Sequence, residues 1–171
     1  KKKSENYQVC ILMGSASDAP VMRAAYDILA EFGVVARMSV TSAHRTHERT
    51  VKIVREALRD GVKCFIVGAG MAAHLAGVIA SQTILPVIGV PLEASSLGGL
   101  DALLSTVQMP PGVPVATMGI GKAGAKNAGL FAIEMLAVNN AELAEKLTAY
   151  RKDQAKAVAE ADSKIQKELM A

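Results

Sequence analysis

Short apolar runs alternate with stretches of helical periodicity along most of the chain, and this alternation leaves few folds open to it. Each apolar run has the length of a strand, and the residues after it place apolar side chains three or four positions apart. Strands joined in this way by helices lie parallel, because the helix carries the chain back across the sheet. The pattern predicts an α/β fold, a three-layer sandwich around a five-stranded parallel sheet of the flavodoxin or Rossmann type.

The predicted elements follow one another regularly. Strands are expected at residues 7–13, 34–40, 63–67, 86–90 and 113–118. Helices are expected at residues 20–32, 47–59, 72–82, 100–106 and 122–137, of which the second is charged and exposed. The first helix begins at Pro20, a residue favoured in a first helical turn, and ends at Gly33. A charged helical pattern then covers residues 141–170, as one helix or as two pieces.

Composition excludes several classes of protein. The chain of 171 residues is 51% hydrophobic, which provides a core for one domain and is too apolar for a disordered protein. Aromatic residues make up only 4% and the formal net charge is +3, so we expect no nucleic-acid partner. Cys10 and Cys64 lie in apolar runs and are predicted to be reduced core residues of a cytoplasmic protein.

The centre of the chain is almost free of charge. Between residues 64 and 121 the formal charges are Glu93 and Asp101. Glycines, prolines and polar residues divide this stretch into pieces shorter than the roughly 20 apolar residues that span a membrane, so we expect no membrane span. The stretch is predicted to be the centre of the fold, covered on every side and in part by neighbouring subunits.

Three parts of the chain are expected: a disordered basic N-terminus at residues 1–6, a single α/β domain at 7–138 and a C-terminal helical extension at 139–171. The extension has a discontinuous apolar face, and a five-stranded sheet covered by helices is nearly complete without it. We expect the extension to pack on a neighbouring subunit. Periodicity alone fits a solvated terminal helix equally well.

Polar residues gather in loops after the first two predicted strands, at the sheet edge where ligands bind in parallel sheets. The first loop, Gly14-Ser15-Ala16-Ser17-Asp18, offers hydroxyls and backbone N–H groups ahead of a helix. This arrangement suits a phosphate, although Ser and Asp are also usual helix caps. The second loop, Ser42-Ala43-His44-Arg45-Thr46, combines a guanidinium that pairs with phosphate and an imidazole that exchanges protons near neutral pH.

The third loop, Gly68-Ala69-Gly70-Met71-Ala72-Ala73-His74-Leu75, leaves two functions open. Its glycines let a ligand approach the backbone, and His74 is either a ligand contact or a hydrogen-bonded structural histidine. The same residues match a G-x-G-x-x-G/A dinucleotide pattern, and Glu93 follows about 20 residues on as the ribose-binding acid would. A dinucleotide-dependent oxidoreductase is therefore one alternative, and a non-catalytic nucleotide-binding sensor using the first loop is another. The histidines lack partners at metal-ligand spacing, so no metal site is expected.

Five motifs in order resemble the PurE family: the three loops above, Val107-Gln108-Met109-Pro110, and the segment 119–128 that begins Gly-Ile-Gly-Lys. The resemblance runs from about residue 9 to residue 151. The second and third loops resemble the mutase branch of the family, because the carboxylase branch carries Lys after the third-loop histidine.

The resemblance implies an isomerase of purine (IMP) biosynthesis. Its substrate would be the small molecule 5-(carboxyamino)imidazole ribonucleotide, and its product the isomer carboxylated on carbon. The reaction would proceed by decarboxylation and recarboxylation without a cofactor, with His44 as general acid and base and His74 close to the migrating carboxylate. Family members assemble as homo-octamers with sites at subunit boundaries, so the resemblance implies an octamer here.

The resemblance also implies which positions bind substrate. The first loop would hold the ribose phosphate end and Arg45 would grip the phosphate. The full set of implied substrate-binding positions is Gly14, Ser15, Ser17, Asp18, Ser42, Ala43, Arg45, Gly70, Ala72 and Leu75. The chain departs from the family pattern at His47 and Ala76, where Pro is usual, and at Met71, where Gly is usual. The Met71 side chain is expected either to point away from the pocket or to narrow it.

Overall fold

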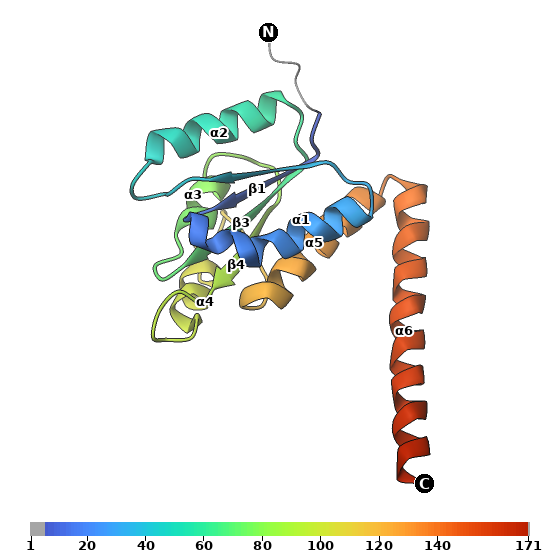
Figure 1. The fold of residues 1–171 in the computed structure, drawn as a ribbon. Helices are drawn as coiled ribbons and strands as arrows, with labels where there is room; N and C mark the ends of the chain where they lie inside the picture. Colours follow the sequence, from blue (N-terminus) through green and yellow to red (C-terminus); the bar gives the residue numbers. More distant parts are fainter. Residues whose placement is uncertain (1–5, 171) are drawn as a thin grey trace. The chain divides into compact units, whose positions relative to one another are not determined.

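The computed structural model describes residues 6–170 and contains one five-stranded parallel sheet (Figure 1). Its strand order is β2-β1-β3-β4-β5. The strands are β1 (Val9–Met13), β2 (Ala36–Val40), β3 (Cys64–Gly70), β4 (Val87–Leu92) and β5 (Ala116–Thr117). The predicted α/β fold is therefore confirmed. Most of the segment predicted to be disordered, residues 1–5, lies outside the described residues.

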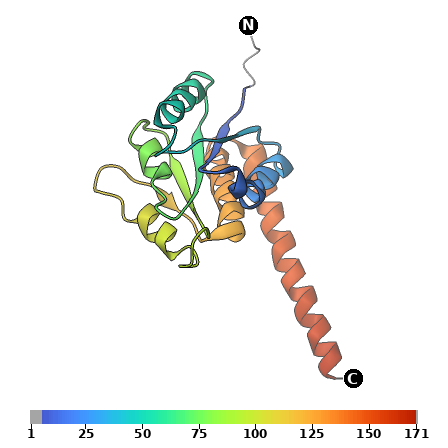
Figure 2. The same ribbon diagram turned by 60° about the vertical axis from the view of Figure 1, so that its left-hand side comes forward.

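Helices cover both faces of the sheet. They are α1 (Ala19–Glu31), α2 (His47–Arg59), α3 (Leu75–Ala80), α4 (Leu100–Val107) and α5 (Gly121–Ala137), with a short 3₁₀ helix, η1 (Ala16–Asp18), ahead of α1. Figure 2 shows α1 and α5 on one face and α2, α3 and α4 on the other. The chain therefore forms the predicted three layers.

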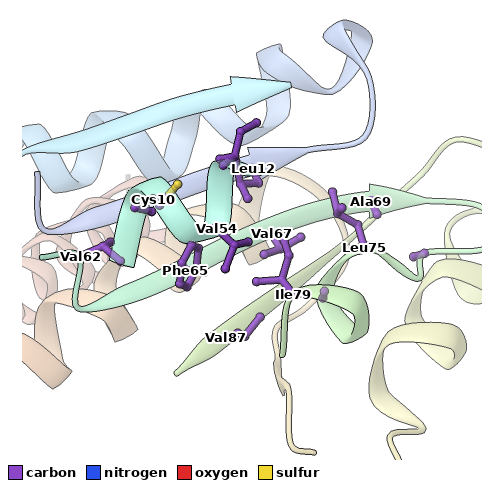
Figure 3. Packing of buried hydrophobic residues seen from close by; sticks show 14 of the residues in the cluster. Cys10, Leu12, Val54, Val62, Phe65, Val67, Ala69, Leu75, Ile79 and Val87 are labelled. Atoms are coloured by element: carbon purple, nitrogen blue, oxygen red, sulfur yellow. The ribbon is translucent and has the colours of Figure 1, made fainter. Parts of the chain in front are cut away.

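One buried cluster joins the sheet to α2 and α3 (Figure 3). Phe65 and Val67 of β3 lie within it together with Val54 of α2 and Ile79 of α3. Cys10 also belongs to this cluster, and both cysteines are free and buried, as predicted. Burial raises the pKa of each thiol to about 12, so both stay protonated at neutral pH.

The third strand is longer than the sequence predicts. Residues 68–70 were expected to form a loop, but they continue β3, because β4 also extends to Leu92 and pairs with them. The glycines provide close packing rather than a turn. A Cβ on Gly68 would lie 2.3 Å from the sulfur of Met22, and one on Gly70 would lie 2.4 Å from the Cβ of Ala94.

Several other boundaries differ from the prediction. β1 and β2 begin two residues late and β5 has only two residues. The helix expected at residues 72–82 is the six-residue α3, because residues 72–74 and 81–82 lie outside it. The helix α2, expected to be exposed, buries one face that includes Ile53, Val54 and Ala57. Its charges occupy the opposite face, which is the amphipathic arrangement of a helix packed on a core.

The described residues from Glu134 onward form a second compact unit, distinct from the one that ends at Ile133. Most of this unit is α6 (Ala141–Leu169), one continuous helix rather than two pieces. Asn140 caps its start by accepting a hydrogen bond from the Leu143 N–H at 3.1 Å. Ion pairs four residues apart, such as Glu142–Lys146, follow along its exposed surface. Across residues 6–170, no helix is long and apolar enough to cross a membrane.

Candidate active site

The strand order reverses between β1 and β3, and a cleft of about 560 Å³ lies at the carboxyl ends of the strands beside this point. In the register of the sheet, Met13 of β1 pairs with Val40 of β2 and Gly68 of β3. The loops that follow therefore start near one level and converge. The cleft is lined by Gly14, Ser15, Ser17, Asp18, Ser42, Ala43, His44, Arg45, Ala69, Gly70, Met71, Ala72, His74, Leu75 and Ala94.

The loop after β1 is a reciprocal cap. The Ser15 hydroxyl accepts a hydrogen bond from the Ser17 N–H at 3.3 Å, and the Asp18 carboxylate accepts one from the Ser15 N–H at 2.9 Å. The Ser17 hydroxyl also donates to the Ser15 hydroxyl at 2.8 Å. The capping role that Ser and Asp often have ahead of a helix is thus present here. The same residues face the cleft, so capping and ligand contact are compatible.

Burial raises the pKa of Asp18 above its usual value, and the backbone N–H groups of Ser15 and Gly14 partly offset this effect. The side chain is 9% exposed, so its carboxylate is held largely away from solvent. A carboxylate fixed in this way at the cleft floor accepts hydrogen bonds and suits the hydroxyl groups of a ligand.

Arg45 joins the loops after β1 and β2. Its Nη2 donates to the Gly14 carbonyl at 3.2 Å, and its Nε donates to the Ser42 hydroxyl at 3.4 Å. The guanidinium has five N–H donors in a plane, so these two bonds leave others for an anion. The exposed Arg45 therefore supplies a fixed positive charge beside the backbone N–H groups of the first loop.

Hydrogen bonds among threonine hydroxyls connect this second loop to α2. Thr41 and Thr50 are buried, and their hydroxyl oxygens lie 2.8 Å apart. Thr46 closes the loop, because its hydroxyl accepts from the Ser42 N–H at 2.9 Å and lies 3.3 Å from the Thr41 hydroxyl. Helix α2 thereby holds the loop that carries His44 and Arg45.

The turn after β3 has an unusual backbone. Met71 has a φ of 55°, in the left-handed region where a side chain is strained and glycine is favoured. Its side chain is 58% exposed at the edge of the cleft. This conformation gives a physical reason for the glycine usual at this position in the family that the sequence resembles.

The second and third loops meet through two imidazoles. His44 Nε2 and His74 Nδ1 lie 2.9 Å apart, and the rings are nearly perpendicular, at 83°. One nitrogen donates and the other accepts, so the two rings share a proton at this contact. Such a pair, on a cleft that Arg45 also lines, is equipped for proton transfer to a bound ligand.

Every position that the resemblance implies for catalysis or substrate binding lies on this cleft. Ala69 and Ala94 also line the cleft and were not among the expected binding residues, whereas Met71, expected either to point away or to narrow the pocket, lines it. The signal for Ala94 was available, because the loop after β4 begins at the same edge of the sheet. His47 is exposed and lies off the cleft, as do the motifs at 107–110 and 119–128.

The cleft of this single chain is open to solvent. Both histidines and Ala72 are exposed, so one chain alone does not cover the charge-poor stretch on every side. Among residues 6–170, no group of three His, Cys, Asp or Glu side chains is arranged to hold a metal ion.

The dinucleotide alternative loses its structural basis. Its glycine pattern lies within β3, whereas a dinucleotide fingerprint needs a turn that leads directly into a helix. Glu93, the proposed ribose acid, is exposed and does not line the cleft.

Comparison with known proteins gives consistent matches. The model of the AIR carboxylase family matches residues 8–157. A protein of Pyrococcus horikoshii named N5-carboxyaminoimidazole ribonucleotide mutase is 50% identical over 164 residues, covering 96% of this chain and 92% of that protein. A protein of the same name from Mycobacterium tuberculosis is 49% identical, covering 95% and 92%. The crystal structure of Treponema denticola PurE matches with a TM-score of 0.84 at 30% identity, covering 92% of this chain and 97% of that one.

Proposed function

The chain belongs to the AIR carboxylase family, and from this premise we propose how its cleft carries out the reaction of an N5-carboxyaminoimidazole ribonucleotide mutase. It is an enzyme, an isomerase of purine biosynthesis, because relatives of that name are about half identical to it over nearly their whole length. They support neither the oxidoreductase nor the sensor. The observation that carries the proposed chemistry is the contact between His44 and His74 at the mouth of a cleft with an anion-binding end.

The first step breaks the bond between the exocyclic nitrogen and the carboxyl carbon of the substrate. The electron pair of that bond stays on nitrogen, carbon dioxide leaves, and protonated His44 gives its proton to the nitrogen. The products are the free aminoimidazole ribonucleotide, carbon dioxide and neutral His44. His74 supports this step by holding the His44 ring through the 2.9 Å contact.

The second step forms a bond between the ring carbon next to the amine and the carbon of the trapped carbon dioxide. His44, left neutral by the first step, then removes the hydrogen that this ring carbon carried, as a proton. The imidazole returns to its protonated form, so atoms and charges balance without a cofactor. One histidine can act first as acid and then as base because imidazole titrates near neutral pH.

The substrate is held by its phosphate and ribose, which lie away from the reacting atoms. Arg45 and the backbone N–H groups of the first loop bind the phosphate, and Asp18 accepts a hydrogen bond from a ribose hydroxyl. The other implied lining positions, Ser42, Ala43, Gly70, Ala72 and Leu75 among them, form the walls around the ring. Binding energy from the phosphate then keeps the ring in register through both steps.

Assembly would close the cleft. Leu100, Leu104 and Val107 are 47% to 53% exposed and recur every three or four residues of α4, so they form one apolar face of this helix. We propose that this face and the exposed Val158, Ile165 and Leu169 of α6 pack on other copies of the chain in a homo-octamer. The free cysteines support a cytoplasmic location.

The test is to supply 5-(carboxyamino)imidazole ribonucleotide without bicarbonate and to follow its carbon-carboxylated isomer. The protein is expected to form the isomer, and His44→Gln to bind substrate but lose at least a hundredfold in kcat, within the range typical for a general acid–base group. His47→Gln is the matched control, because His47 is exposed and off the cleft. Near-normal turnover by His44→Gln would remove His44 from the role.

A further inference from the structure

The hydroxyl of Ser105 on α4 reaches across to the turn that carries His74. Ser105 Oγ accepts a hydrogen bond from the Ala73 N–H at 3.0 Å, between residues 32 positions apart in sequence. The nearest acceptors for its own proton lie in its helix, the Asp101 carbonyl at 2.8 Å and the Ala102 carbonyl at 3.2 Å, while the Met71 carbonyl of the turn lies at 3.4 Å. A hydroxyl that donates to these carbonyls keeps a lone pair for the Ala73 N–H. The Ser105 hydroxyl is therefore an acceptor for the turn.

The turn needs such an acceptor. Ala73 is 1% exposed, so water does not replace a lost partner for its N–H, and a buried donor without a partner is costly. Met71, two positions before Ala73, has the strained φ of 55°. The next residue, His74, is exposed, so packing does not fix its ring. Ser105 thus holds the backbone between a strained residue and a residue of the proton-transfer pair.

We propose that Ser105 is a positioning residue, which fixes the 71–74 turn through the Ala73 N–H so that His74 stays in contact with His44. Ser105 does not line the cleft, and it acts through the turn rather than on the substrate. This inference rests on the proposed function, in which His74 holds the His44 ring during both proton transfers. Loss of the hydroxyl should therefore lower turnover more than substrate binding, because the phosphate is held by the other two loops.

The chain offers a matched control one residue away. Thr106 is also on α4, is buried, and donates from its hydroxyl to the Ala102 carbonyl of its own helix at 2.7 Å. It faces the sheet, since its methyl group lies against Gly89. Thr106→Val removes a hydroxyl from the same helix and keeps the side-chain shape, without touching the turn. Ser105→Ala removes only the oxygen that Ala73 uses.

The experiment measures kcat and KM of the full chain and both variants, with hydrogen exchange of a peptide covering residues 71–75 in the absence of substrate. For Ser105→Ala we expect kcat to fall about ten- to a hundredfold, as for a small misplacement of a catalytic group, with KM changed less than about threefold. Exchange in the peptide should be at least about tenfold faster, as expected when a protecting hydrogen bond is lost. Thr106→Val should leave kcat and this exchange unchanged.

Three results would overturn the proposal: wild-type kcat in Ser105→Ala, equal losses of kcat in both variants, or a rise in KM with kcat unchanged. Unchanged exchange in Ser105→Ala would also overturn it, because the hydrogen bond would not be what holds the turn. If the wild-type chain itself shows no mutase turnover, the proposed function fails, while the exchange comparison still decides whether Ser105 holds the turn.

Discussion

At the scale of single residues, the burial of Asp18 has opposite consequences for the stability of the fold and for the binding of a ligand. Burial raises its pKa, so the folded chain binds a proton at Asp18 at a higher pH than the unfolded chain does. Stability from this group is therefore present below the ordinary aspartate pKa of 3.8 and is lost as pH rises from there through the raised pKa of the folded chain. The ionised form of Asp18 is therefore less favourable to the fold than the protonated form. Because Asp18 lines the cleft, we attribute the presence of a carboxylate here to ligand binding rather than to stability.

Asp18→Asn removes the charge and keeps an oxygen to accept the Ser15 N–H. We expect the variant to resist urea at pH 7 at least as well as the wild type, and the two chains to converge in stability toward pH 3. Substrate binding should weaken, with KM raised about tenfold, which is the loss of one hydrogen bond to a charged group. Lower stability together with unchanged KM would show that Asp18 is only a helix cap.

Substitutions at Met71 measure the backbone strain in the third loop. A left-handed conformation costs a residue with a side chain about 1 kcal/mol or more, and glycine avoids this cost. Met71→Gly should therefore be more stable than Met71→Ala by about 1 kcal/mol in denaturant unfolding, since both variants lose the exposed side chain equally. Equal stability, or greater stability of the alanine variant, would show that the turn relaxes without strain.

At the scale of elements, the buried hydroxyl pair of Thr41 and Thr50 couples α2 to the loop that carries His44. Thr50→Val removes the nearer hydroxyl partner of Thr41 and leaves the Thr46 hydroxyl at 3.3 Å, so we expect a loss of about 0.5–1.5 kcal/mol in unfolding free energy and a lower kcat. The double variant Thr41→Val, Thr50→Val removes both groups and should recover part of that stability. Additive losses in this double-mutant cycle would contradict the coupling.

Sequence patterns located the elements better than their ends. The helix at His47–Arg59 was predicted to the residue, because its charged and apolar positions alternate with a clear period. The end of β3 was misplaced, because glycines that signal a loop are there to make room for Met22 and Ala94, and such packing is visible only in three dimensions. For the same reason the support that Ser105 gives to the 71–74 turn was out of reach of the sequence, since the two lie 32 residues apart.

At the scale of the whole molecule, the loops that form the cleft could be predicted because a parallel sheet brings the carboxyl ends of its strands to one edge. The exposure of both histidines in the single chain could not, because a sequence pattern does not show how far one chain covers its own site. A pocket that keeps carbon dioxide beside the ring must exclude water, so the account needs other copies of the chain to cover it.

Leu104→Glu tests that requirement. Leu104 is 49% exposed on the apolar face of α4, and a buried charge at a subunit contact is costly. We expect the variant to form smaller particles by light scattering and to lose activity while its circular dichroism is unchanged. Val35→Glu is the control, because Val35 is an exposed valine outside α4, directly before β2. An unchanged particle mass for Leu104→Glu would place the contact elsewhere.

The most direct measurement follows the carboxyl carbon itself. Substrate labelled with ¹³C in its carboxyl group is incubated with the full chain in unlabelled bicarbonate, and the label in the first product formed is read by mass spectrometry. The account predicts that the product keeps the label, because the carbon dioxide released in the cleft is captured before it escapes. Product whose carboxyl group matches the unlabelled bicarbonate pool would contradict it, since the carboxyl carbon would then have come from solution.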